Sequence, residues 1–343
     1  MTLQWKKLLL LLSGLFFTMV ALEIFLRLIP EEGFQTNNAY QYTKKIGEPA
    51  FQQPFYSMQE LYPLQFDKRD YYKKSEGIIR YDFNQIGSRW LLPEEQSSNG
   101  FNVFVLGDSF TLGFGLRYAD TYIHRTQDQL NQKGIHINFW NFAKPAANSK
   151  QCLSIYQRCA KRIEHQVILY GLHLNDLIEF PTSYVINLET SRITRALLRR
   201  SRLFYFILKT KNSYMDRKRR IMELTSPVVF DKPYFKENLQ SILSLQQESE
   251  KGHKEFRVVV LPILVDLNQD TFRPVYQNIL QILKERGIRF FDLTNSVRGS
   301  RDSDYWILPF DQHPNEKANE IFANRLTESF LQDPAIAKAL QAR

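Results

Sequence analysis

Residues 101–331 alternate short apolar segments with amphipathic ones, and this alternation restricts the fold more than any other feature of the chain. We expect strands over residues 101–106, 135–141, 166–171, 256–263 and 288–292, and helices over residues 117–133, 150–163, 234–250, 274–286 and 316–331. Strands separated by helices of this length favour a mostly parallel sheet with helices on both faces. The sequence therefore predicts a three-layer α/β/α fold.

An apolar segment near the N-terminus stands apart from this pattern. Residues 8–22 carry no charge, and Glu23 and Arg27 are the only charged residues from there to residue 29. A helix of this length rises about 1.5 Å per residue and can cross a bilayer core of about 30 Å. We expect residues 1–30 to form a transmembrane anchor.

Lys6 and Lys7 precede the apolar segment, and basic residues favour the cytoplasmic side of a membrane. The N-terminus is therefore expected in the cytoplasm and the rest of the chain in the periplasm or outside the cell. A cleaved signal peptide is the main alternative, although Ala21-Leu22-Glu23 offers no small-residue cleavage site. A buried core helix is a further alternative.

The net charge of +9 is concentrated in one segment. Residues 192–220 contain eleven basic residues and one acidic residue, Asp216, so the segment carries +10 and the rest of the chain −1. This distribution does not indicate a nucleic-acid partner. The segment belongs to an insertion at about residues 177–233 and has the pattern of a basic amphipathic helix. It could be a surface helix, a lid over the active site or a second membrane contact.

The chain has two cysteines, Cys152 and Cys159, which both fall in one expected helix. Seven residues of helix separate them by about 10 Å along its axis, too far for a disulfide. We expect two ordinary thiols, and neither a metal site nor a cofactor site.

The first expected strand ends at a Gly-Asp-Ser tripeptide, which places Ser109 where an open α/β sheet presents reactive groups. Serine is a weak nucleophile until a neighbouring base activates it. His313 is the candidate base, and Asp311 is the candidate residue that orients it. We therefore expect a catalytic triad of Ser109, His313 and Asp311, with Asp108 shaping the turn.

A further element is Asn175, in Gly-Leu-His-Leu-Asn-Asp after the third expected strand. Together with Gly-Asp-Ser and Asp-Gln-His-Pro-Asn, it makes residues 101–330 resemble the SGNH (GDSL-type) hydrolases. The resemblance implies a flavodoxin-like sheet and acyl-enzyme chemistry without a cofactor. It also implies an oxyanion hole made by the backbone N–H groups of Ser109 and Ala143 and the side-chain amide of Asn175. His173 is expected to be structural or peripheral.

The chain departs from the usual family pattern at several positions. Ala143 and Ala146 stand where the family usually has glycines, and alanine keeps the N–H but tolerates a positive φ poorly. Ala318 replaces a glycine common after the histidine. Asp311 lies two residues before His313 and not three, a spacing also found in SGNH-like polysaccharide O-acetyltransferases, which leaves the contact between the two side chains open.

Residues 31–100 are expected to be an extended spacer that docks on the α/β domain, and residues 332–343 a C-terminal tail. Within the spacer, residues 84–89 resemble an Asn-x-x-Gly-x-Arg stretch that often precedes the Gly-Asp-Ser block in membrane-anchored SGNH proteins. An ordinary turn is the alternative interpretation.

These features predict a membrane-anchored, extracytoplasmic serine hydrolase that cleaves an ester, with an O-acyl group of an envelope glycan or lipid as the expected substrate. An O-acyltransferase that modifies a cell-envelope polysaccharide is the first alternative, because it shares the acyl-enzyme. A noncatalytic envelope or glycan-binding protein that keeps the fold is the second.

Overall fold

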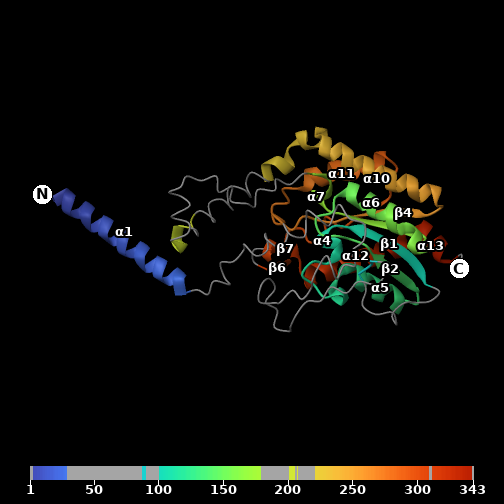
Figure 1. Cartoon of the computed structure of the whole chain (residues 1–343), viewed down its shortest axis with the longest axis horizontal. Helices are drawn as coiled ribbons and strands as arrows, with labels where there is room; N and C mark the ends of the chain where they lie inside the picture. The colour runs from blue at the N-terminus through green and yellow to red at the C-terminus, as the bar shows by residue number, and fades with distance from the viewer. Residues whose placement is uncertain are drawn as a thin grey trace. The chain divides into compact units, whose positions relative to one another are not determined.

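A computed structural model of the chain describes residues 3–28, 87–89, 100–178, 201–204, 207, 221–308 and 311–341 (Figure 1). The chain divides into two compact units. One contains Met1–Gln41 and Phe180–Glu223, and the other contains Tyr42–Glu179 and Leu224–Arg343. Most of the expected spacer and most of the expected basic insertion lie outside the described residues.

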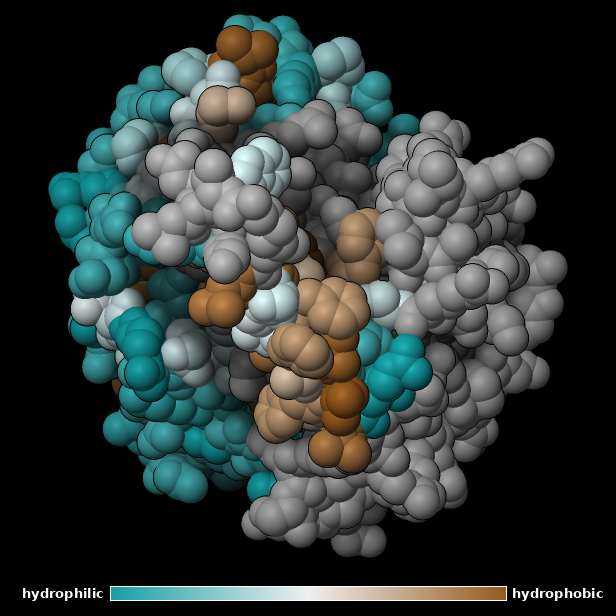
Figure 2. Space-filling model, turned by 90° about the vertical axis from the view of Figure 1, so that its left-hand side faces the viewer, coloured by the Kyte–Doolittle hydropathy of each residue, from teal (hydrophilic) through white to brown (hydrophobic). Residues whose placement is uncertain are grey.

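Helix α1, Leu3–Leu28, belongs to the first unit. Its stretch Leu10–Leu28 is long and apolar enough to cross a membrane. The apolar side chains that give α1 its brown and tan colours in Figure 2 are largely exposed, with Leu10 at 79% and Phe17 at 69%. A core helix buries such side chains. Helix α1 therefore fits a membrane anchor or a signal sequence and does not fit a core helix.

The sheet of the second unit has five parallel strands among the described residues. They are β1 (Phe101–Gly107), β2 (Ile137–Asn141), β3 (Val167–Leu172), β4 (Glu255–Val260) and β5 (Phe290–Asp292), in the order β2-β1-β3-β4-β5. The chain runs outward from β1 to β2 and then crosses back to β3. The strand order therefore reverses between β1 and β3, and open α/β sheets bind ligands beside such a reversal, at the carboxyl ends of the strands.

Helices cover both faces of this sheet (Figure 1). Helices α5 (Tyr122–Gln132) and α12 (Glu316–Gln332) pack together on one face, and α6 (Ser149–Cys159), α10 (Pro233–Lys251) and α11 (Arg273–Glu285) cover the other. Right-handed crossovers between parallel strands produce this division, because each change of direction along the sheet moves the helix to the opposite face. The expected three-layer α/β/α fold is confirmed.

The main core lies between the sheet and the face made by α5 and α12. Val103 and Val105 of β1 and Phe139 of β2 point to this face, because alternate residues of a strand share a side. They pack in one cluster with Ile123 of α5 and Phe322 of α12. All five side chains are fully buried.

Within the described residues, two short α-helices and a two-stranded hairpin were not expected from the sequence. Helices α4 (Ser109–Leu112) and α7 (Leu174–Leu177) have four residues each, and β6 (Trp306–Leu308) pairs with β7 (Asp311–Pro314) in an antiparallel hairpin. Single helical turns and strands of three or four residues are too short to show a periodic pattern. The expected C-terminal tail also contains a helix, α13 (Pro334–Gln341), whose Ile336 is fully buried.

Candidate active site

Ser109 is the first residue of α4 and follows the carboxyl end of β1 almost directly. The carboxylate of Asp108 accepts a hydrogen bond of 2.8 Å from the Phe110 N–H, so Asp108 caps the short helix as expected. Gly107 is required for a steric reason: a Cβ there would lie 2.4 Å from Oγ1 of Thr111. The turn thus holds Ser109 at the reversal point of the sheet.

Ser109, His313 and Asp311 form a continuous chain of contacts. Nε2 of His313 lies 2.9 Å from Oγ of Ser109, and Nδ1 of His313 lies 2.5 Å from Oδ1 of Asp311. An ionised carboxylate can only accept, so Nδ1 carries the proton and Nε2 is left to accept from the serine hydroxyl. This is the arrangement in which a histidine can act as a general base.

The spacing of two between Asp311 and His313 follows from the hairpin. Both residues lie in the extended strand β7, where residues i and i+2 point to the same side. The two side chains are therefore neighbours without any turn between them. The His313 backbone N–H also donates to Oδ1 of Asp311, at 3.1 Å.

The environment of His313 favours its charged form. Partial burial lowers the pKa of His313, but the Asp311 carboxylate acts against this through its charge and its hydrogen bond and raises that pKa above the usual value. The imidazolium that forms when the base takes a proton is stabilised in the same way.

The backbone N–H groups around the site differ in what they already bind. No acceptor among the described residues takes the N–H of Ser109 or of Ala146. The N–H of Ala143 donates to Oδ1 of Asn141 at 3.0 Å, and Ala143 is buried. Ala143 was expected to supply an oxyanion donor, and in this structure its N–H is already used within the loop. Ala146 lies exposed in the same loop and is the better candidate.

The two alanines of this loop also differ in backbone conformation. Ala146 has a φ of 58°, in the left-handed region, whereas Ala143 is not among the described residues with positive φ. A non-glycine residue in this region costs roughly 1–2 kcal/mol. Of these two alanines that stand in place of glycines, only Ala146 therefore has a strained backbone conformation.

Asn175 lies in α7, just beyond the carboxyl end of β3, and β3 is the strand that pairs with β1. Its neighbour Asp176 is fully buried and accepts hydrogen bonds from the His173 N–H at 3.0 Å and the Tyr170 hydroxyl at 2.9 Å. Burial and the Asp108 carboxylate raise the pKa of Asp176 well above its usual range. These bonds fix the turn that carries Asn175.

Arg89 is a residue of the site region that the sequence only hinted at. It is fully buried, and its guanidinium donates to the carbonyl oxygens of Leu112, Gly113 (3.0 Å) and Leu116 (2.6 Å), which end or follow α4. Its backbone N–H donates to the carbonyl of Asn141 at 2.8 Å. The Asn-x-x-Gly-x-Arg stretch therefore ends in a residue that joins the serine helix to the carboxyl end of β2.

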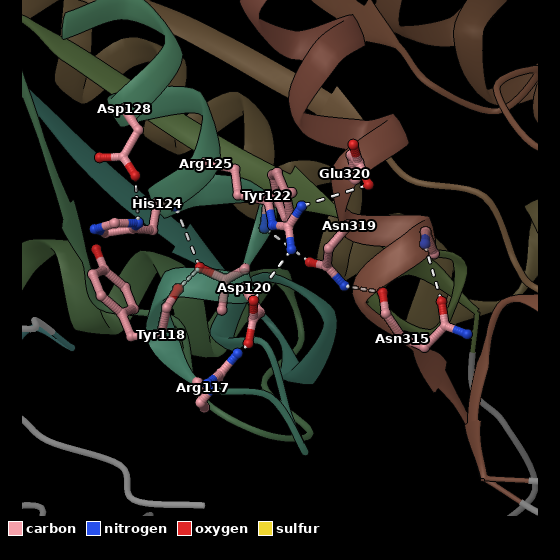
Figure 3. Close-up of polar contacts among 12 residues, drawn as sticks. Arg117, Tyr118, Asp120, Tyr122, His124, Arg125, Asp128, Asn315, Asn319 and Glu320 are labelled. Carbon is pink, nitrogen blue, oxygen red and sulfur yellow. Dashed lines mark hydrogen bonds and ion pairs between the residues drawn. The ribbon is translucent and has the colours of Figure 1, made fainter. Parts of the chain in front are cut away.

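Helix α12 supports the strand that carries His313 (Figure 3). Asn319 of α12 accepts a hydrogen bond of 2.9 Å from the Tyr122 N–H at the start of α5. Its amide nitrogen donates to the carbonyls of Pro314 at 3.2 Å and Asn315 at 2.9 Å. Asn315 caps α12, with its side chain accepting from the Ala318 N–H at 3.0 Å. Ala318 thus fits a buried helical position.

A cavity of about 380 Å³ lies beyond the carboxyl ends of β4 and β5. Phe272 and Tyr276 line it together with Arg298, and none of Ser109, His313 and Asp311 does. It is therefore separate from the chain of contacts around Ser109.

No group of three or more metal-binding side chains occurs within the described part of the chain. Cys152 and Cys159 are both buried, free thiols in α6. Burial raises the pKa of each thiol, so neither has the character of a reactive cysteine.

Comparisons with known proteins give similarity in structure only. No family model matches the chain, and no curated protein matches it. Among solved structures, a lipolytic protein of the G-D-S-L family from Veillonella parvula is similar at 13% identity and a TM-score of 0.39, over 68% of this chain and 100% of that one. A psychrotrophic esterase from Pseudoalteromonas is similar at 14% identity and a TM-score of 0.40, over 67% and 97%. An acetyl-xylooligosaccharide esterase from Geobacillus is similar at 13% identity and a TM-score of 0.43, over 68% and 95%.

Proposed function

We propose that the chain is a serine hydrolase of the SGNH type that cleaves an ester. The observation that carries this proposal is the unbroken contact from Ser109 through His313 to Asp311, at 2.9 Å and 2.5 Å. Serine, base and orienting carboxylate in this geometry are what nucleophilic acyl transfer requires.

In the proposed reaction, Oγ of Ser109 attacks the ester carbonyl while Nε2 of His313 takes the hydroxyl proton. The N–H groups of Ser109 and Ala146 and the side-chain amide of Asn175 donate to the oxyanion. Collapse of the tetrahedral intermediate breaks the bond to the alcohol, which leaves with the proton from His313. Water then repeats these steps on the acyl-enzyme and releases the acid.

Helix α1 is proposed to be a retained membrane anchor, with a cytoplasmic N-terminus and the α/β unit in the periplasm or outside the cell. Glu23 of α1 accepts hydrogen bonds from Oγ of Ser201 at 2.9 Å and from the N–H groups of Arg202 at 3.1 Å and Leu203 at 2.8 Å. The Arg202 guanidinium in turn donates to the Leu26 carbonyl at 3.0 Å. Removal of α1 as a signal peptide would take away these hydrogen-bond partners, which supports the proposal that α1 is retained.

The same contacts favour a membrane contact for the insertion over the lid and surface-helix interpretations. Residues 201–203 contact the last turns of the proposed anchor, and we propose that they lie at the depth of the lipid headgroups. Ile207 is 48% exposed there. A fluorophore on Ile207→Cys in liposomes should be quenched by brominated lipids, whereas one on Asn268→Cys, in an exposed loop of the α/β unit, should not. Equal quenching at both positions would contradict this assignment.

An anchored enzyme outside the cytoplasm meets esters of the envelope, so we propose an O-acyl group on an envelope glycan or lipid as the substrate. The test is turnover of p-nitrophenyl acetate by the detergent-solubilised chain, with and without Ser109→Ala. Loss of turnover in the folded variant supports the proposal, and equal background rates for both proteins reject it. Acyl transfer to an added glycan at the expense of hydrolysis would identify the chain as an acyltransferase.

A further inference from the structure

His173 is a buried histidine whose ring contacts the side chain of the proposed oxyanion residue Asn175. It lies between β3 and α7 and is 5% exposed. Nδ1 of its ring is 2.7 Å from Oδ1 of Asn175. The ring also stacks on Phe110, the residue after Ser109, with centroids 4.0 Å apart and an angle of 24°.

The protonation of His173 follows from its neighbours. An amide oxygen only accepts, so Nδ1 must donate the hydrogen bond to Asn175. Burial lowers the pKa of His173, opposed by the Asp108 carboxylate and by the Asn175 hydrogen bond, and the net direction is downward. The lowered pKa favours the neutral ring, and the contact with Asn175 requires its proton on Nδ1. Consistently, Nε2 is buried and has no hydrogen-bond partner among the described residues.

The hydrogen bond from His173 leaves the Asn175 amide one favourable orientation. If the amide turned over, its NH₂ group would face the N–H of His173, and two donors would oppose each other in a buried place. Oxyanion donors work because they are already oriented before the charge develops. A donor behind Oδ1 therefore fixes the NH₂ group as the end that remains for the substrate.

We propose that His173 is a positioning residue: its Nδ1–H holds the Asn175 amide in the orientation that serves as an oxyanion donor. The stacked ring links Asn175 to the turn that carries Ser109. This inference rests on the proposed ester hydrolysis and adds to it a residue that touches neither substrate nor nucleophile.

Two variants distinguish the hydrogen bond that His173 donates to Asn175 from the stacking of its ring on Phe110. His173→Phe keeps a ring against Phe110 and removes the donor, and His173→Asn keeps an N–H donor and removes the ring. Loss of one oxyanion donor costs roughly 100- to 1,000-fold in kcat. We expect His173→Phe to lose roughly 10- to 100-fold in kcat with little change in KM, and His173→Asn to be at least tenfold more active than His173→Phe. The exposed His136 supplies a control, since His136→Phe should not alter turnover.

A double-mutant cycle tests whether His173 acts through Asn175. In full-length protein with folding checked by circular dichroism, His173→Phe should cost nothing further once Asn175→Ala is present. Two losses that simply multiply would overturn the proposal, as would a His173→Asn variant no better than His173→Phe.

A second measurement keeps this inference distinct from the proposed function. Absence of Ser109-dependent turnover in the unmodified chain would reject ester hydrolysis but not the His173–Asn175 contact. Nitrogen NMR of the His173 ring reports the tautomer directly, and the contact requires the proton on Nδ1. A ring protonated on Nε2 would overturn the inference whatever the activity.

Discussion

Replacement of Arg89 by methionine tests whether the segment before the sheet is part of the catalytic unit. Arg89 is fully buried and donates to the carbonyls of Leu112, Gly113 and Leu116, while its own N–H pairs with Asn141. Methionine fills a similar volume but donates nothing, so three carbonyl oxygens at the end of the serine helix lose this donor.

The size of the effect follows from these contacts. The Gly113 carbonyl still accepts from the Leu116 N–H, at 3.1 Å, so two carbonyls, those of Leu112 and Leu116, lose their donor. A buried polar group left without a partner costs about 1–3 kcal/mol, and two carbonyls in the lower part of this range give about 2–4 kcal/mol. In a unit of this size 1 kcal/mol shifts Tm by about 2–4 °C, so the expected fall is roughly 4–16 °C. Arg89→Lys keeps the positive charge but loses the planar, forked set of N–H donors, so its Tm should lie between those of Arg89→Met and the native chain.

Intrinsic tryptophan fluorescence of the detergent-solubilised chain measures this unfolding through Trp140 and Trp306. Arg286→Met is the matched control, because Arg286 is exposed at the end of α11 and its side chain makes none of the hydrogen bonds described. If Arg89→Met and Arg286→Met melt within 1 °C of each other, the guanidinium does not hold α4 and the reasoning fails.

Three further predictions concern the proton, the loop and the thiols. Asp311→Asn removes the carboxylate charge that raises the pKa of His313. Because the neutral histidine is the active form of the base, the acid limb of the pH profile of kcat/KM should move to lower pH, and the plateau of kcat/KM should fall on the order of 10⁴-fold. An acid limb at the same pH as in the native chain would contradict the role assigned to Asp311. Ala146→Gly relieves a positive φ and should raise Tm by roughly 1–4 °C, for a net gain of about 0.5–1 kcal/mol; a lower Tm would mean that the loop is unstrained. Cys152 and Cys159 should react with a thiol reagent only after denaturation, and stoichiometric labelling of native protein would show that α6 opens.

The layer architecture could be predicted from the sequence because long periodic segments carry it. The five parallel strands and five long helices that the structure describes in the α/β unit were expected within a few residues of where they lie. Buried parallel strands such as β3 are continuous apolar runs, and helices such as α11 have a clear apolar face. The hairpin of β6 and β7 could not be predicted, since its second strand carries Asp311, His313 and Pro314 and has no apolar alternation.

The structure brings the three expected triad residues, Ser109, His313 and Asp311, into contact. Ser109 follows the end of β1, and the sheet topology fixes where that end lies. The donor of the loop after β2 was assigned to Ala143 from the sequence, and only the structure shows that the Ala143 N–H already donates to Asn141. His173 was expected to be structural or peripheral, and its contact with Asn175 was not foreseen because a single histidine next to a motif has no pattern of its own. The Asn-x-x-Gly-x-Arg stretch did point to Arg89, and an arginine at a fixed place before the first strand could have been interpreted as a buried hydrogen-bond donor.

The contacts that complete the site join the two ends of the α/β unit in sequence. His313 meets Ser109 across 204 residues, and Asn319 meets Tyr122 across 197. Chains are synthesised from the N-terminus, and a contact of such separation forms only after the later partner has emerged. A chain still being synthesised therefore carries Ser109 without His313 and without α12, the helix that supports β7. The proposed acyl chemistry can therefore begin only when the last helices have folded, and a product truncated before β7 would lack His313 and should be inactive.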